Sequence, residues 1–97
     1  MFDKMKQLME MKQQADKIKK ELDATLVECT DVAGIKLVIN GSQEIQSIAI
    51  EDRLVSIENK KHLERDVMRS VNAAIRKAQM TAAKKMQNLL PGGFPGM

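Results

Sequence analysis

The 97-residue sequence predicts an α+β fold: a long N-terminal helix, a small antiparallel three-stranded sheet and a long C-terminal helix. Residues 1–25 and 60–90 place apolar side chains three and four positions apart, which is the spacing of an amphipathic helix. Between them, apolar residues recur at every second position of residues 35–39, as in a strand with one buried face. Asn40-Gly41 follows, and this dipeptide is a strong hairpin signal.

The first helix is predicted from composition as well as spacing. Residues 1–25 contain no Gly or Pro and are rich in Met, Lys, Gln and Glu, which favour helices. At about 100° per residue, one face carries the apolar stripe and the other is polar. The stripe consists of Leu8, Met11, Ala15, Ile18 and Leu22, and the opposite side carries Lys6, Gln13, Lys17 and Lys20.

The sheet occupies residues 26–50. We expect a first strand over residues 26–30, ahead of an Ala33-Gly34 turn, and a third strand marked by isoleucines after the Asn40-Gly41 turn. These isoleucines are Ile45, Ile48 and Ile50.

The register of the second hairpin depends on the length of its loop. A two-residue loop would set Leu37 opposite Glu44. A four-residue loop would set Ile35 opposite Ile48, which is better for burial of apolar side chains.

Residues 51–59 form a polar connector, and residues 60–90 form the second helix. The apolar stripe of this helix consists of Leu63, Val67, Val71, Ala74, Ala78, Ala82, Met86 and Leu89. The opposite side, within about 120°, carries Arg65, Arg69, Arg76, Lys77 and Lys84. Pro91 disfavours helix in the residue before it. The sequence therefore predicts one α-β-β-β-α domain over residues 1–90 and a flexible Gly/Pro-rich tail over residues 91–97.

The predicted helices are long for so small a domain. At 1.5 Å per residue they span roughly 35 and 45 Å, whereas a compact domain of this size has a radius of gyration of about 13 Å. Unless the helices break, they must project beyond the sheet. Their apolar stripes must then be covered by pairing with each other, by a second subunit, or by both.

The charge of the chain is unevenly distributed. Residues 59–97 hold eight Lys and Arg against two acids, a net +6, whereas residues 26–58 hold two bases against six acids, a net −4. No acid follows Asp66. Charged helix faces are often merely solvated, but here the acids that would interleave with the bases are missing. Positive charge concentrated on one element is typical of proteins that bind polyanions.

Several function classes are disfavoured by composition. The single cysteine, Cys29, is predicted to be a buried strand residue, and the single histidine, His62, a solvated one. No set of residues has the spacing of a metal site, a phosphate loop or a catalytic group. We therefore expect no enzyme activity, cofactor, metal or small-molecule substrate. The charged N-terminus and the lack of a long apolar run predict a cytoplasmic protein without membrane association.

The scarcity of aromatic residues indicates how a polyanion would be bound. Readers of single strands stack bases on aromatic side chains, and this chain has only Phe2 and Phe94. Lys and Arg contact phosphates instead, which positions a protein but reads no bases. The predicted partner is duplex DNA, bound with little sequence preference. The predicted DNA-binding residues are Lys6, Lys17, Lys20, Arg65, Arg69, Arg76, Lys77, Lys84 and Lys85.

Four segments resemble a known family. They are Val38–Gly41, Glu44–Asp52, Val71–Gln79, and Met86 with the ending Leu89–Met97. Together with the Met/Gln/Lys-rich opening they make the chain similar, over essentially its whole length, to the YbaB/EbfC family of bacterial nucleoid-associated proteins. One departure is Arg53 after Asp52, where the family often has Asp-Pro, and it concerns only the local turn.

The resemblance implies a homodimer shaped like tweezers, with joined sheets and long helices as prongs. It also implies DNA binding that alters DNA conformation in a cytoplasmic nucleoid, with roles in nucleoid organisation and gene regulation, and no catalytic residues. An alternative is a prefoldin-like chaperone module, because helix, hairpin and helix also follow one another there and both stripes are heptad-like.

Overall fold

The structure, a computed structural model, describes residues 2–89 and confirms the predicted α+β class and the order of its elements. The elements are α1 (Phe2–Ala24), β1 (Leu26–Cys29), β2 (Ile35–Asn40), β3 (Ile45–Ile50), the short 3₁₀ helix η1 (Asp52–Leu54) and α2 (Lys60–Leu89). The three strands form one antiparallel sheet in the order β1-β2-β3. The predicted tail over residues 91–97 lies outside the described residues.

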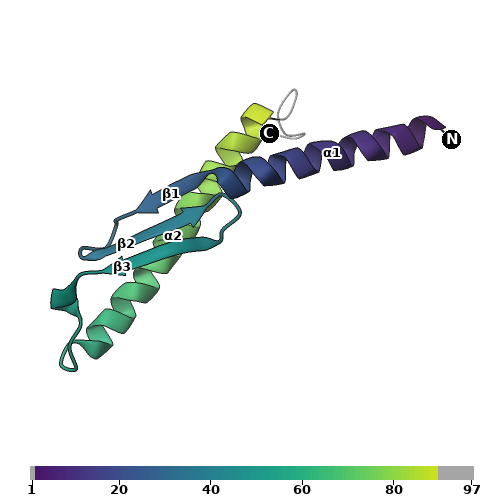
Figure 1. The fold of residues 1–97 in the computed structure, drawn as a ribbon. Coiled ribbons are helices and arrows are strands. Elements are labelled where there is room, and N and C mark those ends of the chain that lie inside the picture. Colours follow the sequence, from purple (N-terminus) through teal and green to yellow (C-terminus); the bar gives the residue numbers. More distant parts are fainter. Residues whose placement is uncertain (1, 90–97) are drawn as a thin grey trace.

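Both long helices project beyond the sheet, as their lengths predicted. The molecule measures 67 × 22 × 17 Å, with a radius of gyration of 18.6 Å, against the roughly 13 Å of a compact domain of this size. The middle of α2 lies against one face of the sheet, and α1 leaves the sheet at the end where the loop between β2 and β3 lies (Figure 1). No helix within residues 2–89 combines the length and apolar character of a membrane span.

The core is the contact between α2 and the strands β1 and β2. Four small residues of α2 are buried there: Ser70, Ala73, Ala74 and Ala78. They face Val27, Cys29, Leu37 and Ile39 of the sheet. Because the helix presents only small side chains, its axis can come close to the sheet while the larger strand residues fill the space between. Cys29 is fully buried, which confirms its predicted strand position.

The buried face of α2 is rotated relative to the apolar stripe predicted from sequence. Ala74 and Ala78 are buried as expected, but the buried face also includes Asp66, Ser70 and Ala73. The far flank of the stripe is therefore only partly covered. Val71 packs against the core from this flank and stays half-buried.

Both predicted registers of the second hairpin are wrong. The structure pairs Ile35 with Ile50 and Leu37 with Ile48. Asn40 remains in the strand instead of joining the turn, and a register shift between Val38 and Ile39 adds a residue to the β3 side. Residues 41–44 connect the two strands, and the added residue on the β3 side is what moves the register beyond both alternatives. The observed register still places isoleucines opposite one another on the α2 face of the sheet.

Asn40-Gly41 marks the hairpin, but for a different reason from the expected one. The left-handed backbone conformation of this loop is taken by Gln43, at φ 64°. Gly41 instead lets α1 approach, since its backbone N–H donates to the Leu22 and Thr25 carbonyls at 2.9 Å each. A Cβ atom at position 41 would lie only 3.0 Å from the Leu22 carbonyl oxygen.

The two long helices contact each other only near the C-terminal ends of both. Ile18 and Leu22 of α1 are half-buried, and Glu21 lies 3.6 Å from the ammonium of Lys85. Further toward the N-terminus the stripe of α1 is uncovered, with Leu8 65% exposed and Met11 66% exposed. Pairing along the whole length, one of the two expected ways to cover the stripes, does not occur within the described chain.

The carboxylate of Asp23, at the end of α1, carries a shifted pKa. The Ser42 hydroxyl donates a hydrogen bond to it, and the Lys19 ammonium lies 3.0 Å away. The Ser42 hydrogen bond, followed by the one from Lys19, lowers the pKa of Asp23 below its ordinary value of 3.8. Both groups favour the ionised form, so the folded state prefers the charged carboxylate more than the unfolded chain does.

The tight α2–sheet contact predicts that an enlarged side chain at Ala74 destabilises the fold. Ala74→Leu inserts three carbon atoms where there is no accessible surface, and overpacking of this kind costs about 1–3 kcal/mol. The measurement is urea unfolding at one fixed protein concentration. Ala83→Leu, at an exposed position of the same helix, is the matched control and should leave the midpoint nearly unchanged. Equal effects of the two substitutions would contradict the packing described above.

The lowered pKa of Asp23 predicts acid sensitivity. The stabilisation from this group is complete above the unfolded-state pKa of 3.8 and is lost as the pH falls through the lower folded-state pKa. Asp23→Asn removes the titration, so its loss of stability relative to the wild type should be largest near neutral pH and shrink in acid. Thermal unfolding followed by circular dichroism between pH 2 and 7 (approximate limits set by the ordinary Asp pKa) tests this. A difference independent of pH would show that the Asp23 charge contributes nothing.

Candidate nucleic-acid interface

The outer face of α2 gathers positive charge opposite the sheet. Lys61, Arg65, Arg69 and Arg76 follow at intervals of four, four and seven residues, so they share one side of the helix. All four are exposed, and the buried Ala74 lies on the opposite side. Lys61 was not among the residues predicted from sequence, although its position four residues before Arg65 could have identified it.

Three of the predicted cations have partners within the chain. The Lys77 ammonium donates to the Glu28 carbonyl oxygen of β1 at 2.7 Å, and Lys85 pairs with Glu21 of α1 at 3.6 Å. Arg69 lies 3.6 Å from Asp66 and remains exposed. Lys77 therefore fastens α2 to the edge of the sheet and does not join the outer basic face where the angular count had placed it.

The other predicted cations are exposed, and the structure gives them no ion pair or side-chain hydrogen bond within residues 2–89. They are Lys6, Lys17, Lys20, Arg65, Arg76 and Lys84. Arg65 and Arg76 lie together with Arg69 on the body of the molecule. The three lysines of α1 lie on the other long helix, so the structure divides the predicted site between two elements.

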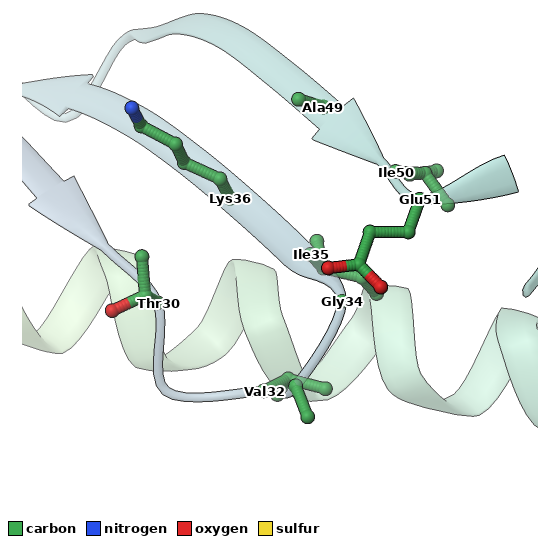
Figure 2. A pocket seen from close by; sticks show the side chains of 9 residues that line it. Thr30, Val32, Gly34, Ile35, Lys36, Ala49, Ile50 and Glu51 are labelled. Carbon is green, nitrogen blue, oxygen red and sulfur yellow. The ribbon is translucent and has the colours of Figure 1, made fainter. Parts of the chain in front are cut away.

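Two hollows in the surface of residues 2–89 bear on the candidate site. One hollow of about 350 Å³ lies at the end of the sheet, between the β1–β2 turn and the end of β3, and its lining is mainly apolar or small (Figure 2). Its two charged side chains are engaged elsewhere: Lys36 lies 3.4 Å from Glu28, and Glu51 lies 2.6 Å from Arg53. No part of this hollow presents a group poised for chemistry.

A second hollow borders the basic face. It has a volume of about 290 Å³ and is lined by Asp31 and Val32 of the β1–β2 turn and by Arg69, Asn72, Ala73 and Arg76 of α2. Two guanidinium groups and an amide thus border one polar notch, where donors suited to phosphate oxygens are close together. The carboxylate of Asp31 reduces the positive potential there.

The titratable residues singled out in the sequence make no metal centre. Among residues 2–89, no three His, Cys, Asp or Glu side chains are grouped so that they could hold an ion. His62 is exposed, as predicted, and its Nε2 lies 3.5 Å from the carboxylate of Asp66. Asp66 thereby lies between His62 and Arg69 at the edge of the basic face.

The fold has a counterpart among solved structures. An uncharacterised protein from Helicobacter pylori superposes with a TM-score of 0.73 over 94% of this chain and 98% of its own, at 18% sequence identity. At that identity the likeness establishes a shared fold.

Sequence relatives match over nearly their full length. A nucleoid-associated protein of Chloroflexus aurantiacus is 37% identical over 94 residues, covering 96% of this chain and 93% of its own. One from Dictyoglomus thermophilum is 34% identical over 92 residues, covering 94% and 88%. The model of the YbaB/EbfC DNA-binding family matches residues 1–94. The four segments that carried the resemblance therefore belong to a match along the whole chain, and the protein is a member of the YbaB/EbfC DNA-binding family.

Proposed function

We propose that this protein is a nucleoid-associated protein of the bacterial cytoplasm that binds duplex DNA through its phosphates, with little preference for sequence. The observation that carries the proposal is the outer face of α2. Arg65, Arg69 and Arg76 are exposed there, and no acid follows Asp66 in the helix. Membership of a DNA-binding family and the names of the relatives support the same function.

The chemistry of these side chains explains the weak sequence preference. Each Lys or Arg that neutralises a phosphate releases counterions, which favours binding at low salt. Base edges are not read by such contacts. The described residues contain no aromatic side chain apart from Phe2 at the start of α1, so a stacking platform for unpaired bases is not formed on the sheet. Duplex DNA, whose phosphates follow a regular path, is the ligand that this surface fits.

Binding by two separate basic elements provides a route to altered DNA conformation. The cations of α2 lie on the body, and Lys6 lies near the far end of the projecting α1. A duplex that contacts both helices must follow the path between them. If this path is bent, the additional phosphate contacts offset the energy of bending the DNA. We infer from this a role in nucleoid organisation and, through DNA shape, in gene regulation.

A second copy of the chain is proposed to cover the apolar surface beside β3. Only β1 and β2 are covered by α2, so Ile45 and Ile48 of the edge strand are 45% and 47% exposed on the α2 side of the sheet. The half-buried Val71 and Ile75 continue this surface, because Lys77 points to β1 and these residues lie on the opposite flank of α2. Small domains commonly cover such a surface by self-association. A homodimer would also double the number of phosphate contacts.

The exposed stripe at the N-terminal end of α1 favours the prefoldin-like alternative as a second candidate function. An uncovered stripe of Leu8, Met9 and Met11 can bind an unfolded chain as well as a partner helix. The test is whether the protein suppresses the aggregation of a denatured client protein. If added duplex DNA abolishes this suppression, one surface binds both ligands. Suppression that DNA does not affect would place the chaperone function first.

Charge reversal on α2 is expected to abolish DNA binding. In Arg65→Glu/Arg76→Glu the outer face loses two cations per chain that would bind phosphates, and it gains two repulsive charges. Fluorescence anisotropy of a labelled random-sequence duplex, measured at several salt concentrations, should show at least a tenfold loss of affinity at about 50 mM salt. The salt slope should be smaller by about 1 for each phosphate that is no longer neutralised.

The matched control is Lys36→Glu/Arg53→Glu, which changes the net charge equally but alters cations away from α2. It should weaken binding much less, and both variants should keep the helical circular dichroism of the wild type. If the two double variants bind equally, net charge and not the outer face of α2 controls affinity. Unrelated duplexes should bind wild type with similar affinity.

The proposed dimer surface predicts that Ile48→Lys yields a monomer. The substitution places a charge in the centre of the apolar surface, which disfavours burial there. Light scattering coupled to size-exclusion chromatography should give twice the chain mass of 10.9 kDa for the wild type and the single chain mass for the variant. Leu26→Lys, at a 64% exposed residue of the opposite edge strand, should remain a dimer. A wild-type monomer at micromolar concentration would reject the proposal.

A further inference from the structure

The C-terminal end of α1 is capped by a distant part of the chain. A helix end leaves its last carbonyl groups without intrahelical donors. Here the Leu22 carbonyl accepts from the Gly41 N–H at 2.9 Å, and the Asp23 carbonyl accepts from the Asn40 side-chain amide at 3.3 Å. Both donors belong to the hairpin between β2 and β3. The hairpin therefore adds to a local cap, in which Thr25 donates from its N–H to the Leu22 carbonyl at 3.2 Å and from its hydroxyl to the Glu21 carbonyl at 2.6 Å.

The same residues also hold the hairpin loop in one shape. The side-chain oxygen of Asn40 accepts from the Ser42 N–H at 3.0 Å and from the Glu44 N–H at 2.9 Å. Asn40 is only 3% exposed, so these bonds are made away from solvent. The Ser42 hydroxyl then donates to the Asp23 carboxylate. The loop is thus joined to the end of α1 by three kinds of donor: the Gly41 backbone N–H, the Asn40 side-chain amide and the Ser42 hydroxyl.

We propose that Asn40, Gly41 and Ser42, together with Asp23, are positioning residues that fix the direction of α1 and so determine where its lysines meet DNA. The effect on DNA binding rests on the proposed function, whereas the role of these residues in directing α1 does not. We call these four residues the clamp. The cations that contact DNA are those of α1 itself, and the clamp acts only by placing them. α1 contacts the rest of the described chain at this clamp and at its crossing with α2 near Lys85.

The length of α1 makes its direction consequential. From Asp23 to Lys6 the helix runs about 25 Å at 1.5 Å per residue, so a change of 10° at the clamp moves Lys6 by roughly 4–5 Å. A charge-assisted hydrogen bond to phosphate spans only about 2.7–2.9 Å. A displacement of that size exceeds this range and weakens the phosphate contact of Lys6, while Lys20, near the clamp, moves little.

The clamp can be opened without touching a cation. Gly41→Ala places a Cβ atom 3.0 Å from the Leu22 carbonyl oxygen, a contact so tight that the end of α1 must give way slightly and the Gly41 hydrogen bond is strained. Ser42→Ala removes only the hydroxyl bond to Asp23 and is the milder variant if Gly41→Ala folds poorly. Ser42→Thr keeps a hydroxyl group, and Ser47→Ala, at an exposed position of β3, is a matched control.

The direct test is a distance between the two long helices. Spin labels are attached through Glu10→Cys on α1 and Gln79→Cys on α2, both exposed, while the buried Cys29 is protected from labelling. Labelled chains are diluted with unlabelled protein, so that each measured pair lies within one chain. We expect a distribution that is measurably shifted or broadened in Gly41→Ala and, less strongly, in Ser42→Ala, with the wild-type distribution in Ser42→Thr and Ser47→Ala. A merely structural role would lower the unfolding midpoint without changing the distance in the folded protein.

The functional readout is the salt dependence of binding to the random-sequence duplex. Without the phosphate bound by Lys6, the salt slope should fall by about 1 per chain in Gly41→Ala, with Ser47→Ala unchanged. An unaltered distance distribution in both Gly41→Ala and Ser42→Ala would overturn the clamp, whether or not the protein binds DNA. A shifted distribution with an unchanged salt slope would overturn its link to DNA binding. Failure of the wild type to bind duplex DNA would reject the proposed function instead, and the distance measurement would still decide the geometry.

Discussion

The close contact of α2 with β1 and β2 is the constraint on which the rest of the structure depends. It relies on small side chains, of which Ala74 and Ala78 are fully buried, because larger ones would hold the helix away from the sheet. The contact takes up one side of α2 and leaves the other side free for the arginines. It also fixes the rotation of the helix, which Lys77 reinforces by donating to the Glu28 carbonyl oxygen. Burial and the basic surface are therefore two sides of one packing arrangement.

The same arrangement leaves the core small. α2 covers mainly β1 and β2, so the third strand contributes Ile45 and Ile48 to a surface that residues 2–89 leave about half exposed. The N-terminal end of α1 likewise extends away from the rest of the described chain. A chain this short buries only about 60–65% of its unfolded surface, and long projecting helices reduce that fraction further. The proposed homodimer would cover the edge strand and bring two basic helices into one particle.

The sequence predicted the elements well because their periodicity is local. Both helices, all three strands and the buried Cys29 follow from spacing and composition within a few residues. The register of the hairpin could not be predicted in this way. Asn40 stays in its strand and binds the end of α1, a contact across 17 positions that local spacing cannot reveal. The candidate site was predictable where it depends on one helix, as for Arg65, Arg69 and Arg76. The site was not predictable where a contact with another element sets the direction of a side chain. Lys77 binds β1 and Lys85 pairs with Glu21 only in the folded chain.

The chemistry of the basic face and the geometry of α1 impose different requirements on this family member. Phosphate contacts read no bases and need exposed positive charge, which the outer face of α2 presents on the body of the molecule. The direction of α1 is less tolerant, because an error at its base grows with distance along the helix. Asn40 and Gly41 carry no charge and lie far from Lys6, yet they set where that lysine is. If DNA is bound by the lysines of α1 as proposed, we therefore expect the uncharged residues at the base of α1 to constrain function as strongly as the cations along it.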